Sequence, residues 1–265
     1  MSINDFLQLV TVVDTETTSP LPTEAHVAEL ATACYNQGWT VSQSLFGVDL
    51  GIPPEASAKN QISNRMIAGL PTFEQSVEQV LHMLQLDRPY FVAHNAAYDR
   101  TVLANSWRRA DMAELADIVD QPDRWICTWR LSRHAYQHQF SDQLYGQNYL
   151  RYRLDLPVDD SVGVHRAGED VKVCAALLER LTEDLLAQGS ITTQRPLGPQ
   201  LVNLAAQPIL LNSWPLGKHR GTPVKDLETD YLLWAVDNVK SLDPGDPSFD
   251  SDLYETVRHN LESRL

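Results

Sequence analysis

The chain has 265 residues, 43% of them hydrophobic, and a formal net charge of −14, which is typical of a globular protein with one large domain or one domain and a small appendix. This acidic balance argues against long, sequence-independent wrapping of nucleic acid, although it is compatible with a small site that binds one or two phosphates through metal ions. No apolar run approaches the ~18 residues of a membrane helix, and three cysteines are too few and too scattered for a disulfide framework or a zinc site.

The first predicted element is a buried strand over the apolar run 6–13, which is rich in β-branched residues and lacks Gly and Pro. Asp14 and Glu16 follow it, and residues two apart on a strand share a face, so their carboxylates point the same way. Two like charges this close are unfavourable without a cation between them, and Mg²⁺ takes such oxygen ligands. The alternative is a strand end with two solvated acids, which is the commoner explanation of a bare Asp-x-Glu.

A hairpin and a helix are predicted next. Segments 26–35 and 39–48 are extended and are separated by a plausible turn at 36–38. Residues 51–62 are predicted to be a long polar connection. The period of the apolar residues over 71–86 then predicts an amphipathic helix.

Strands and helices alternate in the second half of the chain. Asp99 begins one predicted helix, and Asp170 lies in the first turn of another, the longest of all. Because three antiparallel strands precede this alternation, the sequence predicts a mixed sheet flanked by helices. Short strands are predicted at 89–94 and 125–128, and helices after residue 95, at 129–136, in part of 140–156 and at 168–188.

The end of the chain is predicted to form a separate small module. Residues 189–207 are rich in Gly, Pro, Ser and Thr and are predicted to be a linker between a domain over 1–188 and a module over 208–265. Lys218, His219 and Arg220 lie between two glycines in this module. They form either a tight turn without function or a basic loop that binds a phosphate, and both alternatives stay open.

Four acidic residues, Asp14, Glu16, Asp99 and Asp170, fall at strand ends or helix starts, where α/β sheets place functional side chains. Each of them alone could be a capping or solvated residue. Together with His165 they match the requirements of two-metal phosphodiester hydrolysis, in which carboxylates hold the metals and a base takes a proton from water. Histidine suits the base because its unperturbed pKa is about 6.5.

Three segments resemble the motifs of the DEDDh (DnaQ-like) 3′–5′ exonucleases: VDTETT at 13–18, HNAAYD at 94–99 and HRAGED at 165–170. The histidine five positions before the last aspartate marks the DEDDh branch. The resemblance implies the α/β ribonuclease H-like exonuclease fold, a mixed five-stranded sheet flanked by helices. The segments LGKHRG at 216–221 and DYLLW at 230–234 resemble the small C-terminal module of exodeoxyribonucleases within this family.

The resemblance also implies residue roles. Asp14, Glu16 and Asp170 would hold the first of two divalent ions (Mg²⁺ or Mn²⁺), Asp14 would bridge to the second with support from Asp99, and His165 would be the general base. The residues implied in substrate binding are Thr15 and its backbone amide, Thr17, Thr18, Leu21, Asn60 and Asn95.

Three further residues have alternative interpretations. Asn60 stands where many relatives carry a histidine that contacts the terminal nucleotide, and it cannot carry charge. Gly168 replaces a larger apolar residue and is expected to loosen the loop that holds His165. Glu29 is interpreted as a solvated edge acid, with a place beside the metal ligands as the alternative.

The predicted function is a metal-dependent 3′–5′ exonuclease that acts mainly on single-stranded DNA and releases nucleoside 5′-monophosphates. One alternative is an RNA exonuclease of the RNase T or oligoribonuclease type, because the contact that reads a 2′-OH is not evident from the sequence. Another is a non-catalytic nucleic-acid-binding adaptor, which would be expected to have lost metal ligands. The expected partner is the 3′ end of single-stranded DNA, with RNA possible, and the expected location is the cytoplasm without membrane association.

Overall fold

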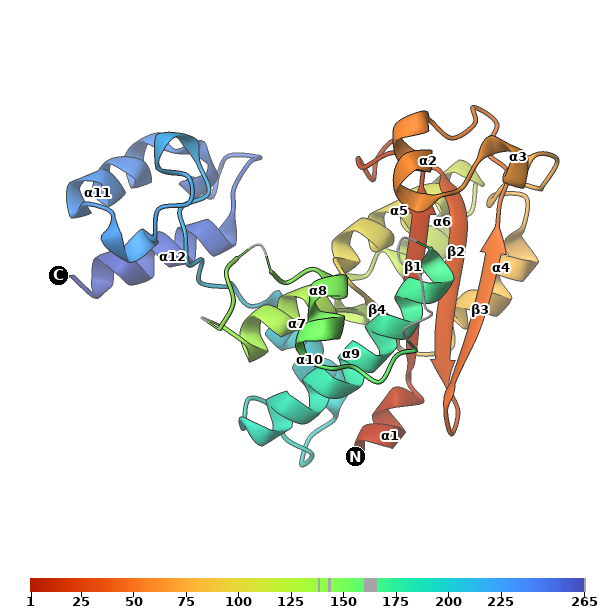
Figure 1. The fold of residues 1–265 in the computed structure, drawn as a ribbon, viewed down its shortest axis with the longest axis horizontal. Coiled ribbons are helices and arrows are strands. Elements are labelled where there is room, and N and C mark those ends of the chain that lie inside the picture. Colours follow the sequence, from red (N-terminus) through yellow and green to blue (C-terminus); the bar gives the residue numbers. More distant parts are fainter. Residues whose placement is uncertain (138, 143, 160–165, 265) are drawn as a thin grey trace. The chain divides into compact units, whose positions relative to one another are not determined.

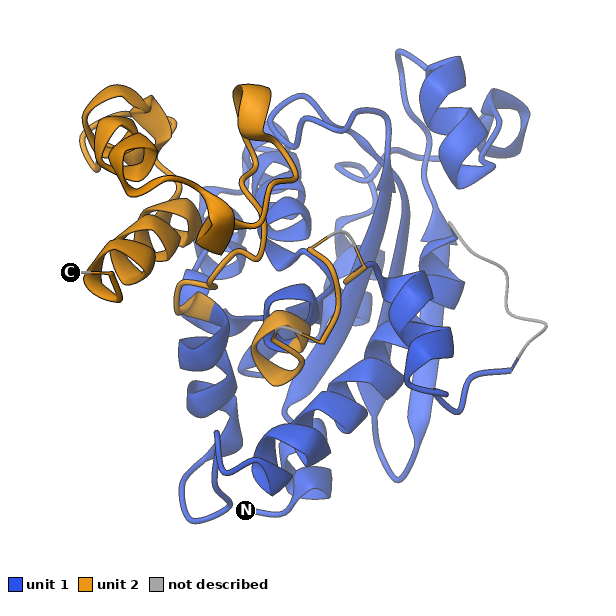
Figure 2. Cartoon of the chain, turned by 60° about the vertical axis from the view of Figure 1, so that its left-hand side comes forward, with its two compact units in different colours: residues 1–131, 146–205 blue, residues 132–145, 206–265 orange. Residues whose placement is uncertain are grey.

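The protein is represented by a computed structural model, which describes residues 1–137, 139–142, 144–159 and 166–264. The chain divides into two compact units, each built from two stretches of sequence (Figure 2). Unit 1 comprises residues 1–131 and 146–205, and unit 2 comprises residues 132–145 and 206–265. The boundaries predicted at residues 188 and 208 stay a prediction. Among the described residues, no helix has the length and apolar character needed to cross a bilayer.

Unit 1 is built on a mixed five-stranded sheet with the strand order β3-β2-β1-β4-β5 (Figure 1). The first three strands are antiparallel, and β1 pairs in parallel with β4, which pairs in parallel with β5. This topology confirms the predicted mixed sheet and the predicted hairpin. The strands are β1 (Val10–Thr17), β2 (Val27–Tyr35), β3 (Trp39–Leu45), β4 (Tyr90–Ala93) and β5 (Trp125–Cys127).

Helices cover both faces of this sheet. The long helix α9 lies across one face, over β1, β2 and β3, whereas α4 and α5 lie against the other (Figure 1). The helices of unit 1 are α1 (Ile3–Leu7), α2 (Pro54–Asn60), α3 (Asn64–Ile67), α4 (Val77–Leu84), α5 (Ala96–Arg109), α6 (Ala113–Val119), α8 (Gln147–Arg153), α9 (Ala167–Ala187) and α10 (Leu197–Ala206), with α7 (Thr128–Ala135) continuing into unit 2.

The structure corrects two predictions near the start of the chain. The run 6–13 is not one strand, because Phe6 and Leu7 belong to helix α1. Ser2 and Asp5 form a capping box that starts this helix, so the strand begins only at Val10. The polar connection over 51–62 is partly helical, because it contains α2.

Two other segments also differ from the prediction. The helix predicted over 71–86 is confirmed only for α4, because Ser76 and the residues before it form turns. The predicted linker over 189–207 contains helix α10, whose Leu197 and Leu201 are buried. Pro199 in the first turn of α10 does not interrupt the helix, since the first backbone N–H groups of a helix have no intrahelical acceptor.

Unit 2 has a hydrophobic core of its own around Trp214. Asp142 joins the two stretches of this unit: its carboxylate accepts hydrogen bonds from the backbone N–H groups of Asn212 (3.1 Å) and Ser213 (2.9 Å) and pairs with Arg133. The regular elements after α10 are η2 (Gly217–His219), η3 (Val224–Asp226), α11 (Thr229–Asn238), η4 (Lys240–Leu242) and α12 (Ser251–Glu262).

Candidate active site

Strand β1 places two acidic side chains on one face of the sheet. Asp14 and Glu16 alternate along the strand with the buried Thr15, so their carboxylates share the face that α9 covers. In the antiparallel pairing with β2, Asp14 stands opposite Ala31, and Glu16 stands opposite Glu29. The register shifts between Glu16 and Thr17, and the strand ends there.

Helix α9 brings a third carboxylate to the same place. Asp170 lies in its first turn, and one carboxylate oxygen each from Asp14, Glu16 and Asp170 lie within 4.8 Å of one another. The side-chain amide of Gln147, on α8, donates a hydrogen bond of 2.8 Å to the backbone carbonyl of Asp170. Asp170, which is far along the chain from Asp14 and Glu16, therefore converges with them as the motifs predicted.

Asp99 approaches β1 from the opposite face of the sheet. It lies in the first turn of α5 and is 4% exposed. One carboxylate oxygen accepts hydrogen bonds from the backbone N–H (3.0 Å) and the hydroxyl (2.8 Å) of Thr15. Because Thr15 lies between Asp14 and Glu16, Asp99 fixes the backbone that carries both of them, although it is not one of the three carboxylates within 4.8 Å.

The electrostatics of the site favour a bound cation. Burial first, and then the charges of Asp99, Asp170 and Glu16, raise the pKa of Asp14 well above its usual value. Burial, with Asp170 and Glu29 nearby, raises the pKa of Glu16 from 4.5 to about 7. Burial also raises the pKa of Asp99 to about 7 despite its hydrogen bonds from Thr15. These shifts mean that ionising all the carboxylates together is unfavourable near neutral pH unless positive charge is supplied.

The donor set fits a hard divalent ion. Three carboxylates within 4.8 Å offer oxygen ligands only, which is the preference of Mg²⁺ and Mn²⁺. Asp14, Glu16 and Asp170 would hold the ion. When bound, it would neutralise charge on a phosphate group and make a water molecule more acidic.

Glu29 is not a solvated edge acid but lies beside the predicted metal ligands, directly opposite Glu16, which was the alternative interpretation. Its strand β2 is internal to the sheet, and the residue is 0% exposed. Arg166 forms an ion pair with it at 2.6 Å. The prediction of a solvated acid is therefore wrong, because an arginine beside helix α9 neutralises the buried charge.

The loop after β1 is held by a group of hydroxyls. The Tyr98 hydroxyl donates a hydrogen bond to the backbone carbonyl of Ser19 (2.5 Å) and is also hydrogen-bonded to the Thr17 hydroxyl. The Thr18 hydroxyl accepts a hydrogen bond of 3.0 Å from the backbone N–H of His26. Leu21, in the same loop, is 55% exposed, and its predicted contact with a substrate base stays a prediction.

Two of the residues predicted to bind substrate have other roles in this structure. The backbone N–H and the hydroxyl of Thr15 both donate to Asp99, so they are not directed at a substrate sugar. Asn60 is 1% exposed, and its amide bonds to the backbone of Thr17 and Ile62. These bonds give Thr15 and Asn60 structural functions, and their predicted contacts with the substrate stay a prediction.

Two other predicted site residues remain. Asn95 is exposed and adopts a left-handed conformation (φ 72°) at the start of α5, so it forms the turn that presents Asp99. The predicted general base, His165, lies outside the described residues, and its role stays a prediction. The expected loosening of its loop by Gly168 also concerns residues outside those described.

Sequence reasoning missed Gln147, Tyr98 and Lys59. Lys59, an exposed residue on α2, is close enough to Glu16 to oppose the rise of its pKa. Tyr98 lies inside the second motif, so its hydroxyl was a readable signal. For Gln147 and Lys59, the sequence held no signal, since their positions depend on how distant helices pack.

Known proteins were compared with this chain and its structure. Residues 11–178 match the model of the exonuclease (RNase_T) family. Exodeoxyribonuclease 10 of Escherichia coli (strain K12) is 26% identical over 261 residues, which cover 96% of this chain and 100% of that protein. These matches confirm the resemblance predicted from the motifs, including the resemblance to exodeoxyribonucleases that was predicted from the C-terminal segments.

Solved structures agree on the fold. Exonuclease X in complex with 5′ overhanging duplex DNA matches with a TM-score of 0.53 and 23% identity, covering 74% of this chain and 99% of that one. The nuclease domain of 3′hExo, a DEDDh family member bound to rAMP, matches with a TM-score of 0.53 and 13% identity. The match covers 66% of this chain and 92% of that domain. The protein therefore has the ribonuclease H-like exonuclease fold.

Proposed function

The chain belongs to the exonuclease (RNase_T) family, and from this premise we propose that it is a metal-dependent 3′–5′ exonuclease acting mainly on single-stranded DNA. The observation that carries the proposal is the convergence of Asp14, Glu16 and Asp170 within 4.8 Å. A protein that had become an inactive adaptor would have no need to keep this costly group of charges. The products would be nucleoside 5′-monophosphates.

The residues divide the work by their positions. Asp14, Glu16 and Asp170 would hold the first of two divalent ions, and Asp99 would support the second while it fixes Thr15. His165, from the third motif, would take a proton from the attacking water, since a positioned imidazole is a suitable base near neutral pH. The loop held by Tyr98 would receive the terminal nucleotide.

The preference for DNA rests on relatives. The E. coli protein that matches along nearly the whole chain is named an exodeoxyribonuclease, and exonuclease X was solved with duplex DNA bearing an overhang. The 3′hExo nuclease domain was solved with rAMP, which keeps RNA as the alternative substrate. A 2′-OH distinguishes the two substrates, so rates on matched strands would decide between them.

Unit 2 would add binding rather than catalysis. Lys218 and Arg220 are exposed on a short turn, and the ring of His219 between them lies 4.3 Å from that of Tyr231. Tyr231 stacks on Trp234, which is 52% exposed. Cations beside an exposed aromatic stack suit a single strand, whose phosphates and bases they would contact.

The experiment uses a single-stranded DNA of about ten nucleotides, labelled at either its 5′ or its 3′ end, with Mg²⁺ or Mn²⁺. Under the proposal, the 3′ label is released first as a mononucleotide, and the 5′-labelled strand shortens stepwise. The same strand as RNA should react more slowly, and Asp170→Asn should abolish both reactions. Release of the 5′ label first, or full activity in Asp170→Asn, would contradict the proposal.

A further inference from the structure

The buried carboxylate of Glu29 accepts four hydrogen bonds. One oxygen accepts from the guanidinium of Arg166 (2.6 Å) and from the side-chain amide of Gln43 (2.5 Å). The other accepts from the same guanidinium (3.1 Å) and from the backbone N–H of Ala167 (3.0 Å). Each oxygen thus has two donors, so Glu29 is fully engaged within the protein and is not placed to bind a metal ion.

The bond to Ala167 caps helix α9 from a neighbouring strand. The residue at the N-cap position, Arg166, makes no capping hydrogen bond with its side chain. The first N–H groups of a helix lack intrahelical acceptors, and a carboxylate there also interacts favourably with the helix dipole. Glu29 supplies both the hydrogen-bond acceptor and the negative charge, and so it fixes the first turn of α9 to strand β2. Asp170 lies in that same turn.

The approach of Gln43 depends on the absence of a side chain at position 168. A Cβ on Gly168 would lie 2.1 Å from the amide oxygen of Gln43 and 2.6 Å from its Cδ. The amide end of the Gln43 side chain occupies the space that glycine leaves at position 168, so a methyl group there would make this amide shift away from its present position beside Glu29. Glycine at position 168 was expected only to loosen the loop that holds His165. It also leaves space for the hydrogen bond between Gln43, on strand β3, and Glu29.

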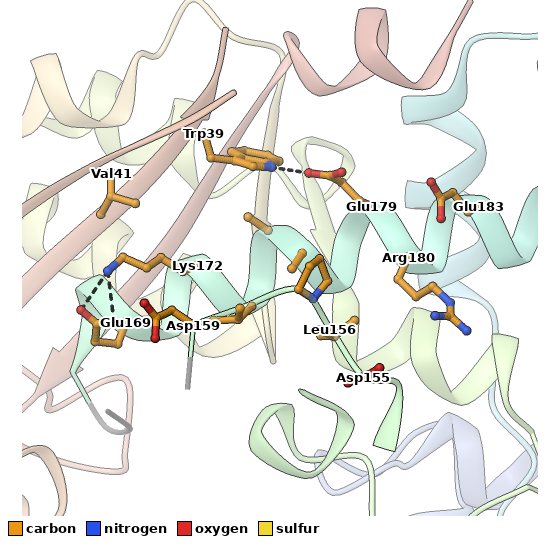
Figure 3. Close-up of a pocket in the computed structure, with 14 residues that line it drawn as sticks. Trp39, Val41, Asp155, Leu156, Asp159, Glu169, Lys172, Glu179, Arg180 and Glu183 are labelled. Atoms are coloured by element: carbon orange, nitrogen blue, oxygen red, sulfur yellow. Dashed lines mark hydrogen bonds and ion pairs between the residues drawn. The ribbon is translucent and has the colours of Figure 1, made fainter. Parts of the chain in front are cut away.

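Edge strand β3 is also tied to α9 further along the helix. The indole N–H of Trp39 donates a hydrogen bond to Glu179, beside a pocket of about 630 Å³ (Figure 3). The lining of this pocket includes Glu169, whose carboxylate pairs with Lys172. The β2–β3 hairpin is thus hydrogen-bonded to α9 at two places, at Ala167 and at Glu179. Only the bond at Ala167 lies in the turn that carries Asp170.

We propose that Glu29 is a positioning residue for the metal site. With Arg166, Gln43 and Gly168 it forms a set that we call the α9 clamp. The clamp holds the first turn of α9 against the sheet and so keeps Asp170 within reach of Asp14 and Glu16. This inference rests on the proposed function, because it assigns the clamp to the metal site of that reaction.

The clamp also explains how a second acid is tolerated beside the site. Glu29 stands directly opposite Glu16 in the sheet, and its charge contributes to the raised pKa of Glu16. Like charges in directly opposite positions destabilise a sheet. Arg166 offsets this repulsion and leaves Glu29 free to act as the acceptor that α9 needs.

The first test is a double-mutant cycle. Gly168→Ala introduces a methyl group that displaces Gln43, and Gln43→Ala removes the same hydrogen bond directly. Each variant is expected to lower kcat about 3–30-fold with little change in KM, and the double variant should be no worse than Gln43→Ala alone. The melting temperature of Gly168→Ala should not fall with its activity, because Ala is the better helix former. Additive losses in kcat would overturn the inference.

The second test measures metal binding without turnover. Glu29→Gln keeps the shape of the side chain but loses the charge that Arg166 requires, and it should weaken Mn²⁺ binding in calorimetry by about tenfold. Glu169→Gln, on the same turn of α9, is the matched control and should bind Mn²⁺ normally. Unchanged binding in Glu29→Gln would overturn the clamp. An inactive wild-type protein that binds Mn²⁺ would instead refute the proposed function.

Discussion

Removing the charge of Asp14 is expected to stabilise the metal-free protein while it abolishes hydrolysis. At 4.8 Å and an effective dielectric constant of about 20, two carboxylates repel each other by about 3.5 kcal/mol. Burial, with the charges of Asp99, Asp170 and Glu16 nearby, raises the pKa of Asp14 well above its usual value, so the fold also disfavours the ionised form of Asp14 itself. Protonation and solvent relieve part of this cost, so Asp14→Asn should raise the free energy of unfolding by about 1–3 kcal/mol at pH 8.

The sign of the effect depends on pH. An acid whose pKa is raised by folding binds more protons in the native state than in the unfolded state between the two pKa values. Metal-free wild-type protein should therefore lose stability as the pH rises from about 4.5 to about 7, the values given for Glu16. The advantage of Asp14→Asn should be largest above pH 7 and should disappear below about pH 3.8, the usual pKa of an Asp, where the carboxylates are protonated in both states.

Thermal unfolding followed by circular dichroism in a chelating buffer measures this difference. The variant should melt about 3–10 °C above wild type at pH 8. Mn²⁺ at 100 times its Kd should stabilise wild type by about 2.7 kcal/mol and the variant by much less. Asp117→Asn, an exposed acid on α6, is the control and should change neither quantity. The reasoning would be refuted if Asp14→Asn melted below wild type without metal. It would also be refuted if Mn²⁺ stabilised the variant as much as it stabilises wild type.

Three further predictions concern catalysis and binding. His165→Ala should lower the rate roughly 10²–10⁴-fold and remove the rise of rate with pH, because only a neutral imidazole accepts a proton. Tyr98→Phe, which removes the hydroxyl bonded to Ser19, should raise KM for single strands about 3–10-fold with a smaller effect on kcat. Lys218→Ala with Arg220→Ala should weaken binding to long single strands and reduce its salt dependence by about 0.7 for each lost phosphate contact.

Each of these predictions has an outcome that contradicts it. Near-normal activity and an unchanged pH profile in His165→Ala would remove this residue from the mechanism. A fall in kcat alone in Tyr98→Phe would place the hydroxyl in the chemical step. Cleavage of a dinucleotide should be unaffected by the changes at Lys218 and Arg220, and an equal loss on short and long strands would mean that unit 2 only supports the fold.

Local sequence signals predicted the sheet and the carboxylates well. The alternation of Asp14, Thr15 and Glu16 determines which side chains share a face, and this needs no knowledge of distant residues. Asp99 and Asp170 lie where their helices begin, as predicted. The start of β1 was misplaced because the apolar character of Phe6 outweighed the capping signal that precedes it.

Features that depend on distant partners could not be predicted. Glu29 is buried only because Arg166, 137 residues further along the chain, neutralises it. Helix α10 has the composition of a linker, and it forms where Gly198 leaves room for the ring of Tyr90. Neither pairing has a signature in the local sequence, since burial and close packing are properties of the assembled fold.

The discontinuous composition of unit 2 has a consequence for biosynthesis. Residues 132–145 leave the ribosome well before residues 206–265, with which they form a unit. At about 5–20 residues per second, Asp142 waits on the order of 10 s for the backbone groups of Asn212 and Ser213 that satisfy its carboxylate. A chain truncated after residue 205 would lack Asn212 and Ser213, so Asp142 would never gain these partners. Unit 1 therefore cannot be produced by a single truncation, because residues 132–145 would remain in the chain without the rest of unit 2.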